Sequence, residues 1–242
     1  MTAASDTDSA VPGHEHRDVS GGWLRPAVFG AMDGLVTNVS LIAGVGGGVG
    51  GSASAPHFII LTGLAGLAAG AFSMATGEYV SVSSQNELVA AEVRKERREL
   101  EVHPEAEREE LAATFQQWGV EPGLAAKVAQ QVSANTEHAL GVHVREELGV
   151  DHNDLPSPVT AGAASLVTFA IGALIPLLPY LLGYDSLAAA LGLAALAAFT
   201  GGGLVARLTD RPFLRGALRQ LLLGAVAAGV TYLIGRVVGA SV

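Results

Sequence analysis

The sequence contains no cysteine. That absence excludes disulfide bonds, thiolate metal ligands and cysteine nucleophiles. Basic residues are also scarce, since 14 Lys and Arg stand against 23 Asp and Glu, which gives a formal net charge of −9. A nucleic acid needs a cationic surface to neutralise its phosphates, so nucleic acid is not expected as a partner.

Charged residues of either sign are nearly missing from two long parts of the chain. Asp33 is the only one between residues 26 and 77, and Asp185 is the only one between residues 155 and 206. The mean hydropathy of +0.40 is high for a soluble domain of this length. Because about 20 apolar residues in a helix cross the hydrocarbon core of a bilayer, each part is long enough for two membrane-spanning helices.

Short glycine-rich or polar segments, residues 46–56 and 182–186, divide these two parts. A further apolar run follows near the C-terminus, with Arg219 and Arg236 close to its ends, where long side chains can reach the interface. The sequence therefore predicts an all-α polytopic membrane protein with five transmembrane helices. Their expected ranges are 26–46, 57–82, 160–182, 186–206 and 215–238, with a kink at Pro176 and Pro179 near the outer end of the third.

Lys and Arg gather in the N-terminal tail, in residues 86–155 and in the loop after the fourth predicted helix. Because such residues accumulate in cytoplasmic loops, the N-terminus and residues 86–155 are predicted to be cytoplasmic and the C-terminus to lie outside. The domains expected are a disordered tail (1–22), transmembrane helices one and two (23–85), a helical metal-binding insert (86–155) and the last three transmembrane helices (156–242). The polar tail, which includes His14 and His16, does not have the pattern of a signal peptide.

The insert is rich in good helix formers. Residues 86–117 are predicted to form helix, broken at His103-Pro104, whose first part continues the second transmembrane helix without interruption. Residues 119–123 are predicted to form a turn, and residues 124 to about 147 one further helix. Residues 149–158 lead back to the membrane.

Glutamates of the insert recur at helical spacing. Glu92, Glu96 and Glu99 are spaced i, i+4 and i+7, and Glu107 and Glu110 are spaced i and i+3. Like charges at these spacings repel by a few tenths of a kcal/mol per pair. A divalent cation would reverse that sign, since hard cations prefer carboxylate oxygen. The alternative is a solvated charged face, with neighbouring arginines as local partners.

Three residues within the apolar stretches can take part in metal chemistry. A carboxylate at mid-bilayer costs ~2.5–3.5 kcal/mol, and no intramembrane Lys or Arg is available to pair with Asp33, so a functional role is favoured there. Met74 and Glu78 are spaced i and i+4, which places a thioether and a carboxylate on one helical face. Thioether sulfur favours transition metals, although packing is an alternative role for Met74.

Three motifs resemble the vacuolar iron transporter family from about Trp23 to the C-terminus. They are Phe29-Gly-Ala-Met-Asp-Gly-Leu35, Ala69-Gly-Ala-Phe-Ser-Met-Ala-Thr-Gly-Glu-Tyr79 and Leu174-Ile-Pro-Leu-Leu-Pro-Tyr180. The resemblance implies a five-span homodimer that exchanges protons for Fe²⁺, and often Mn²⁺, across the bilayer. The exchange that the resemblance implies requires no resident cofactor.

The resemblance also implies roles for individual residues. Asp33 matches the family's intramembrane acid, Met74 matches its translocation methionine, and five insert glutamates match its cytoplasmic ligands (Glu96, Glu99, Glu107, Glu110 and Glu147). Where plant members carry a pair of methionines, this chain has His143 and Val144. His143 could replace one ligand, because imidazole suits Fe²⁺ and Zn²⁺.

The resulting expectation is a secondary transporter that exports cytosolic Fe²⁺ or Mn²⁺, with Zn²⁺ as a further candidate, driven by inward proton movement. The alternatives are a ferroxidase-like di-iron enzyme and a metal sensor that does not transport. The enzyme is disfavoured because none of the insert histidines has a glutamate three residues before it, as carboxylate-bridged di-iron bundles use. Abundant Gly and Ala with scarce Lys suggest a GC-rich bacterium, and hence the plasma membrane.

Overall fold

The computed structural model describes residues 22–50, 52 and 54–241, and every regular element in these residues is helical. Five helical segments of the described residues are long and apolar enough to cross a membrane. They are α1 (Leu24–Val49), α2 (Ala55–Val102), α6 (Pro158–Leu174) continued by η1 (Ile175–Leu177) and α7 (Leu178–Leu181), α8 (Leu187–Leu208) and α9 (Phe213–Gly239). Between the second and third segments lie α3 (Pro104–Gln117), α4 (Pro122–Ser133) and α5 (Thr136–Leu148). The predicted fold class is confirmed. The tail with His14 and His16 lies outside the described residues.

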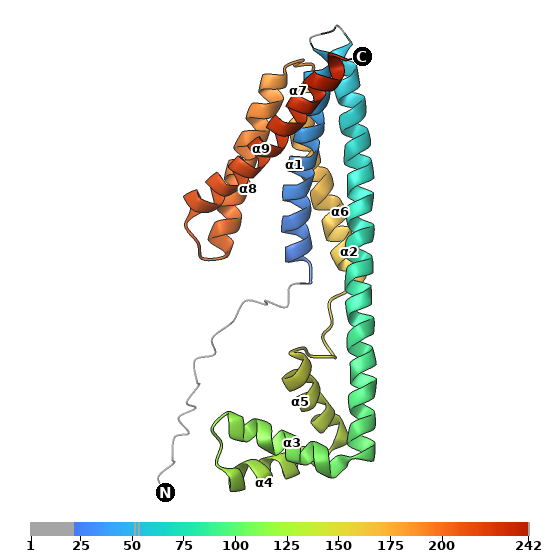
Figure 1. Cartoon of the computed structure of the whole chain (residues 1–242), viewed down its shortest axis with the longest axis vertical. Coiled ribbons are helices and arrows are strands. Elements are labelled where there is room, and N and C mark those ends of the chain that lie inside the picture. Colours follow the sequence, from blue (N-terminus) through green and yellow to red (C-terminus); the bar gives the residue numbers. More distant parts are fainter. Residues whose placement is uncertain (1–21, 51, 53, 242) are drawn as a thin grey trace, which may run out of the picture.

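Helix α2 is the longest element and connects the two ends of the molecule. It runs for 48 residues, roughly 70 Å at 1.5 Å per residue, from the transmembrane bundle to the insert (Figure 1). No Gly or Pro stands between Gly77 and Pro104 to interrupt it. It ends at Val102 with His103 as its C-cap, just before Pro104, which has no backbone N–H to donate. The predicted continuation of the second transmembrane helix into the insert, and its break at His103-Pro104, are confirmed.

Small residues let the transmembrane helices approach closely. A side chain at Gly34 of α1 would clash with the backbone of Phe169 on α6, and one at Gly70 of α2 would clash with the Phe169 ring. Gly63 and Gly66 of α2 likewise face leucine side chains of η1 and α1. These glycines of α2 therefore pack against other helices of the same chain.

The third transmembrane segment changes geometry where a kink was predicted. Helix α6 ends at Leu174, a 3-10 turn contains Pro176, and α7 then begins with Pro179 close to its start. Asn38 of α1, which is completely buried, donates a hydrogen bond from Nδ2 to the carbonyl oxygen of Ala173 at 2.5 Å. This contact ties α1 to the end of α6 in the apolar bundle. Nothing in the local sequence around Asn38 indicated it.

The prediction of one helix over residues 124–147 is wrong. The structure has two helices there, because α4 ends at Ser133 and Asn135 begins α5 as its N-cap. The Asn135 side chain accepts a hydrogen bond from the backbone N–H of His138 at 3.1 Å, which satisfies a donor that a continuous helix would have used internally. The preceding turn also ends earlier than predicted, since Pro122 and Gly123 already belong to α4.

Candidate metal centre

Four side chains from three helices converge at the far end of α2. They are Glu96 of α2, Glu107 of α3, and His143 and Glu147 of α5, and their ligand atoms all lie within 4.8 Å of one another. Nδ1 of His143 lies 3.2 Å from Oε1 of Glu96. It lies 3.6 Å from Oε2 of Glu107 and 3.6 Å from Oε1 of Glu147. The four residues are called the insert cluster below.

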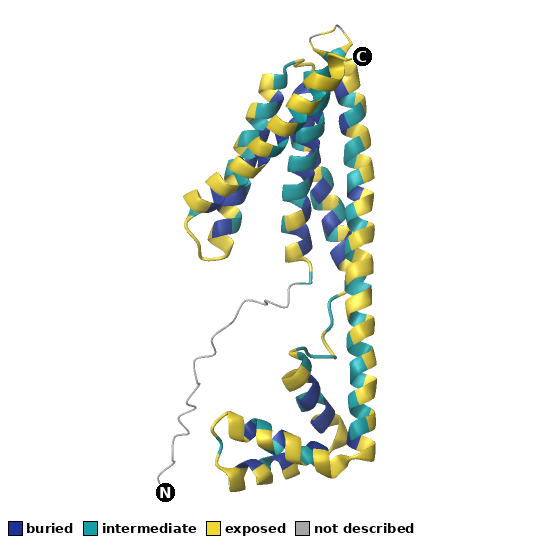
Figure 2. Cartoon of the chain, in the orientation of Figure 1, coloured by how far each residue is buried: buried dark blue, intermediate teal, exposed yellow. Residues whose placement is uncertain are grey.

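The apolar face of α5 explains why His143 points inward. Leu140 and Val144 flank it on the same helix and are almost fully buried, packed with Leu100 of α2. Burying this face against α2 draws His143 in with it, so that the imidazole is only 3 % exposed. The dark residues on α5 in Figure 2 mark this buried face. The break at Asn135 is what lets α5 take its own direction against α2.

The carboxylates of the insert cluster are held in an unfavourable environment for negative charge. The side chains of Glu96 and Glu107 are only 13 % and 11 % exposed. Burial, reinforced by the charges of Glu147, Glu107 and Glu110, raises the pKa of Glu96 to about 7. Burial also raises the pKa of Glu107, with the His143 charge acting in the opposite direction. Gathering these acids therefore destabilises the fold unless a positive charge compensates them.

Lysine and arginine side chains of the described residues do not supply that compensation. The bidentate partner of Arg97 is Glu137 of α5, outside the insert cluster, and Lys95 pairs with Glu92 at 3.8 Å. Among the described residues, no Lys or Arg lies within ion-pair distance of Glu96 or Glu107. Nε2 of His143 is also buried without a hydrogen-bond partner there. A solvated charged face, the alternative that the glutamate spacing left open, does not describe these buried groups.

The donor set of the insert cluster suits a divalent transition metal. Three carboxylate oxygens and one imidazole nitrogen are ligands for Fe²⁺, Mn²⁺ and Zn²⁺, and they include no soft sulfur. Of the other predicted ligands, Glu99 faces His103 at 3.9 Å, and neither it nor Glu110 belongs to the cluster. Both are close enough for their charges to raise the pKa of Glu107.

Glu92 is a neighbour of the insert cluster that the glutamate spacing included but the predicted ligand set did not. It lines a recess of about 20 Å³ together with Glu96 and Glu147. The signal for it was present in the sequence, because Glu92 lies one helical turn before Glu96 on the same face of α2.

The three transmembrane candidates have different surroundings. Asp33 is half-buried on α1. Met74 packs against the buried group formed by Ala71, Phe169 and Ala173, so the thioether has a packing role at least. Glu78 lines a cavity between the helices, whose other walls come from α1, α8 and α9. That Asp33, Met74 and Glu78 together bind metal within the membrane stays a prediction.

The fold defines a polytopic integral membrane protein whose helical insert carries a candidate site for divalent metal. A model of the VIT family matches residues 24–236, and the chain belongs to this family, which is a family of transporters. The vacuolar iron transporter of Acanthamoeba castellanii is 37 % identical over 93 % of this chain and 83 % of its own length. Vacuolar iron transporter 1 of Arabidopsis thaliana is 31 % identical over 93 % of this chain and 89 % of its own length. The predicted family is therefore confirmed.

Proposed function

We propose that this protein is a secondary transporter that moves Fe²⁺, and also Mn²⁺, out of the cytosol in exchange for protons. Membership of a transporter family and relatives named vacuolar iron transporters support the metal. The single observation that carries the proposal is the insert cluster, in which three acids and an imidazole meet and no Lys or Arg of the described residues pairs with Glu96 or Glu107. A divalent cation would stabilise such an arrangement.

In this transporter the insert cluster collects metal ions from the cytosol. Because its ligands must be deprotonated to bind metal, and the pKa of Glu96 is about 7, protons compete with metal near neutral pH. His143 occupies the position for which the resemblance implied a methionine, so a nitrogen ligand replaces a thioether. The site should accept Fe²⁺, Mn²⁺ and Zn²⁺ and discriminate against Cu⁺, which prefers sulfur.

The transmembrane part of the pathway uses Asp33, Met74 and Glu78. A carboxylate that faces the interior of a bundle can hold either a proton or a metal ion, which is the exchange that antiport needs. Glu78 and Glu96 lie on the same face of α2, five helical turns apart, or roughly 27 Å. A single unbroken helix thus connects the collecting site to the membrane site.

The orientation follows from the distribution of basic residues, which favours a cytoplasmic insert. In a bacterium, the membrane is the plasma membrane, and transport from the cytosol is export. The functional unit is a homodimer, as the resemblance implies. These assignments make the proton gradient, directed inward, the source of energy.

Flux into proteoliposomes tests the proposal. Purified protein should accumulate ⁵⁵Fe²⁺, held reduced by ascorbate, faster when a pH gradient is imposed than when an ionophore collapses it. Mn²⁺ should compete for this uptake and Mg²⁺ should not. Metal binding without any flux would indicate that the protein is a metal sensor and not a transporter. Oxidation of Fe²⁺ that requires the insert cluster would instead favour the ferroxidase.

A further inference from the structure

A cavity of about 410 Å³ lies between α1 and the hairpin of α8 and α9, at the end of the bundle that faces the insert. Arg25 and Phe29 of α1 line it together with Arg219 of α9. Val205 of α8 adds to the apolar wall, and Glu78 of α2 also borders the space. The lining therefore combines two guanidinium groups and one carboxylate with an apolar surface.

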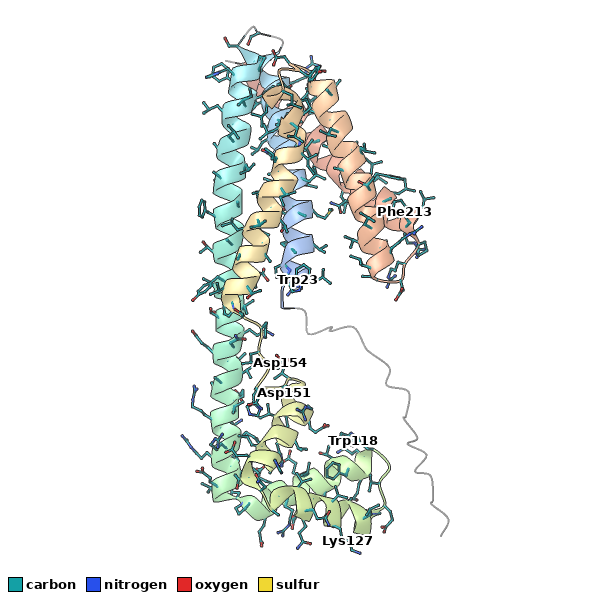
Figure 3. The ribbon with its side chains drawn as sticks, turned by 180° about the vertical axis from the view of Figure 1, so that it is seen from behind. Trp23, Trp118, Lys127, Asp151, Asp154 and Phe213 are labelled. Atoms are coloured by element: carbon teal, nitrogen blue, oxygen red, sulfur yellow. The ribbon has the colours of Figure 1, made fainter. Side chains whose placement is uncertain are left out.

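The packing of α1 against α9 explains why the cavity is at this end. At the opposite end the two helices touch through glycines, since side chains added to Gly235 and Gly239 would clash with the backbone at Gly44 and Gly48. Toward the insert the two helices move apart, as Figure 1 shows for α1, α8 and α9. Trp23 before α1 and Phe213 at the start of α9 are well separated in Figure 3. Close contact at one end and separation at the other leave room for a molecule between the helices.

The two arginines of the cavity have no anionic partner within the described part of the chain. Neither Arg25 nor Arg219 forms an ion pair there, and both side chains are exposed. Their surroundings are strongly basic, because residues 207–219 contain four arginines and one acid, Asp210. Arg207 differs from these two in that it lies over the Phe213 ring, 5.6 Å from its centroid. The cavity thus presents an excess of positive charge at the end of the bundle that faces the insert.

We propose that this cavity binds an anionic phospholipid, with Arg25 and Arg219 donating hydrogen bonds to its phosphodiester. The planar guanidinium matches a phosphate group, and basic pockets between transmembrane helices suit lipid headgroups. Phe29 and Val205 receive the start of the acyl chains. Two arginines and one glutamate give the lining a formal net charge of +1, which balances one phosphodiester. The bound lipid bridges α1 and α9 where their glycine contact ends.

Native mass spectrometry of the full-length protein in detergent tests this site. The probes are dioleoyl phosphatidylglycerol, dioleoyl phosphatidylcholine and inorganic phosphate. Phosphatidylglycerol should bind, and each of Arg25→Gln and Arg219→Gln should weaken that binding roughly tenfold, since each removes a charge-assisted hydrogen bond. Arg236→Gln is the matched control, because it changes an exposed arginine of the same helix at its other end and should leave the affinity unchanged.

Three results would overturn the proposal. Equal affinity of the double Gln variant and the unmodified protein would show that the arginines do not bind the lipid. Equal binding of phosphatidylcholine, or of inorganic phosphate without lipid, would assign the cavity to a different ligand. Lipid adducts on monomers alone would show that a second copy of the chain covers the cavity. Should the Gln variants unfold, Arg25→Lys and Arg219→Lys replace them, because lysine keeps the positive charge. The affinity of these Lys variants for phosphatidylglycerol should lie between that of the unmodified protein and no binding.

Discussion

Replacing Glu96 with Gln should stabilise the metal-free protein while removing its metal response. The pKa of this buried carboxyl is about 7 in the folded protein against 4.5 for the free group. Because each tenfold change in proton affinity corresponds to 1.36 kcal/mol, ionised Glu96 opposes folding by about 3 kcal/mol at pH 8. A glutamine of the same shape carries no charge and avoids this penalty.

The sign of the pH dependence follows from the raised pKa. Below pH 4.5 the carboxyl is neutral in both folded and unfolded states, so Glu96 imposes no penalty. As the pH rises from 4.5 to 7, the unfolded state ionises first and the folded state loses relative stability. Glu96→Gln should therefore show its advantage above pH 7 and lose it on acidification.

The measurement is urea denaturation of the full-length protein in detergent and EDTA, at pH 5 and pH 8. The sequence has two tryptophans, Trp23 and Trp118, so a Trp23→Phe background leaves Trp118 of the insert as the only tryptophan reporter. Glu105→Gln is the matched control, because its side chain is 85 % exposed on α3 and the change should be nearly neutral.

Added Mn²⁺ completes the test. A metal that binds only the folded state stabilises it by an amount that grows with the logarithm of the ratio of its free concentration to its dissociation constant. The unmodified protein should therefore gain stability, and the Glu96→Gln variant should gain little. The reasoning fails if Glu96→Gln destabilises the metal-free protein at pH 8. It also fails if Mn²⁺ stabilises both proteins equally.

Three further predictions concern transport. Asp33→Ala should abolish Fe²⁺ flux in proteoliposomes without unfolding the protein, since an unpaired intramembrane carboxylate is itself destabilising; flux near that of the unmodified protein would remove Asp33 from the pathway. Met74→Leu should change the free energy of unfolding by less than ~1.5 kcal/mol, because leucine keeps the packing against Phe169. It should nevertheless lower Fe²⁺ flux more than any Mg²⁺ flux. Equal loss of both fluxes would show that Met74 has only a packing role. The third variant changes four glutamates to Gln, namely Glu96, Glu99, Glu107 and Glu110. Its Fe²⁺ flux, measured over a range of Fe²⁺ concentrations, should fall mainly at low concentration and recover partly at high concentration. An equal loss of flux at every concentration would contradict a collecting role.

Most of the fold could be predicted because the signals for it are local. An apolar run of about 20 residues needs only its own composition to predict a transmembrane helix. The five predicted ranges agree with the helices of the structure to within a few residues, apart from α2, which continues into the insert as predicted. The break at Asn135 was missed because the residues around it are compatible with helix, and a single cap hydrogen bond decided the outcome.

The candidate metal site was only partly predictable. The spacing of Glu96 and Glu99, and of Glu107 and Glu110, placed acids on helical faces, but spacing within a helix does not say which faces meet. His143 lies 47 residues after Glu96, and no periodic pattern joins them. Their contact depends on where α5 packs against α2, which is why Glu147 entered the cluster while Glu99 and Glu110 stayed beside it.

The sequence by itself determined the number and order of the transmembrane helices, the uninterrupted course of α2 and the family, because hydropathy, helix propensity and motifs act over short stretches of chain. Only the tertiary structure decided which carboxylates meet at His143, that Asn38 holds the end of α6, and that two arginines line the same cavity. These contacts join residues far apart in the chain. They depend on how whole helices pack, through buried apolar faces and close glycine contacts, and no local pattern encodes that packing.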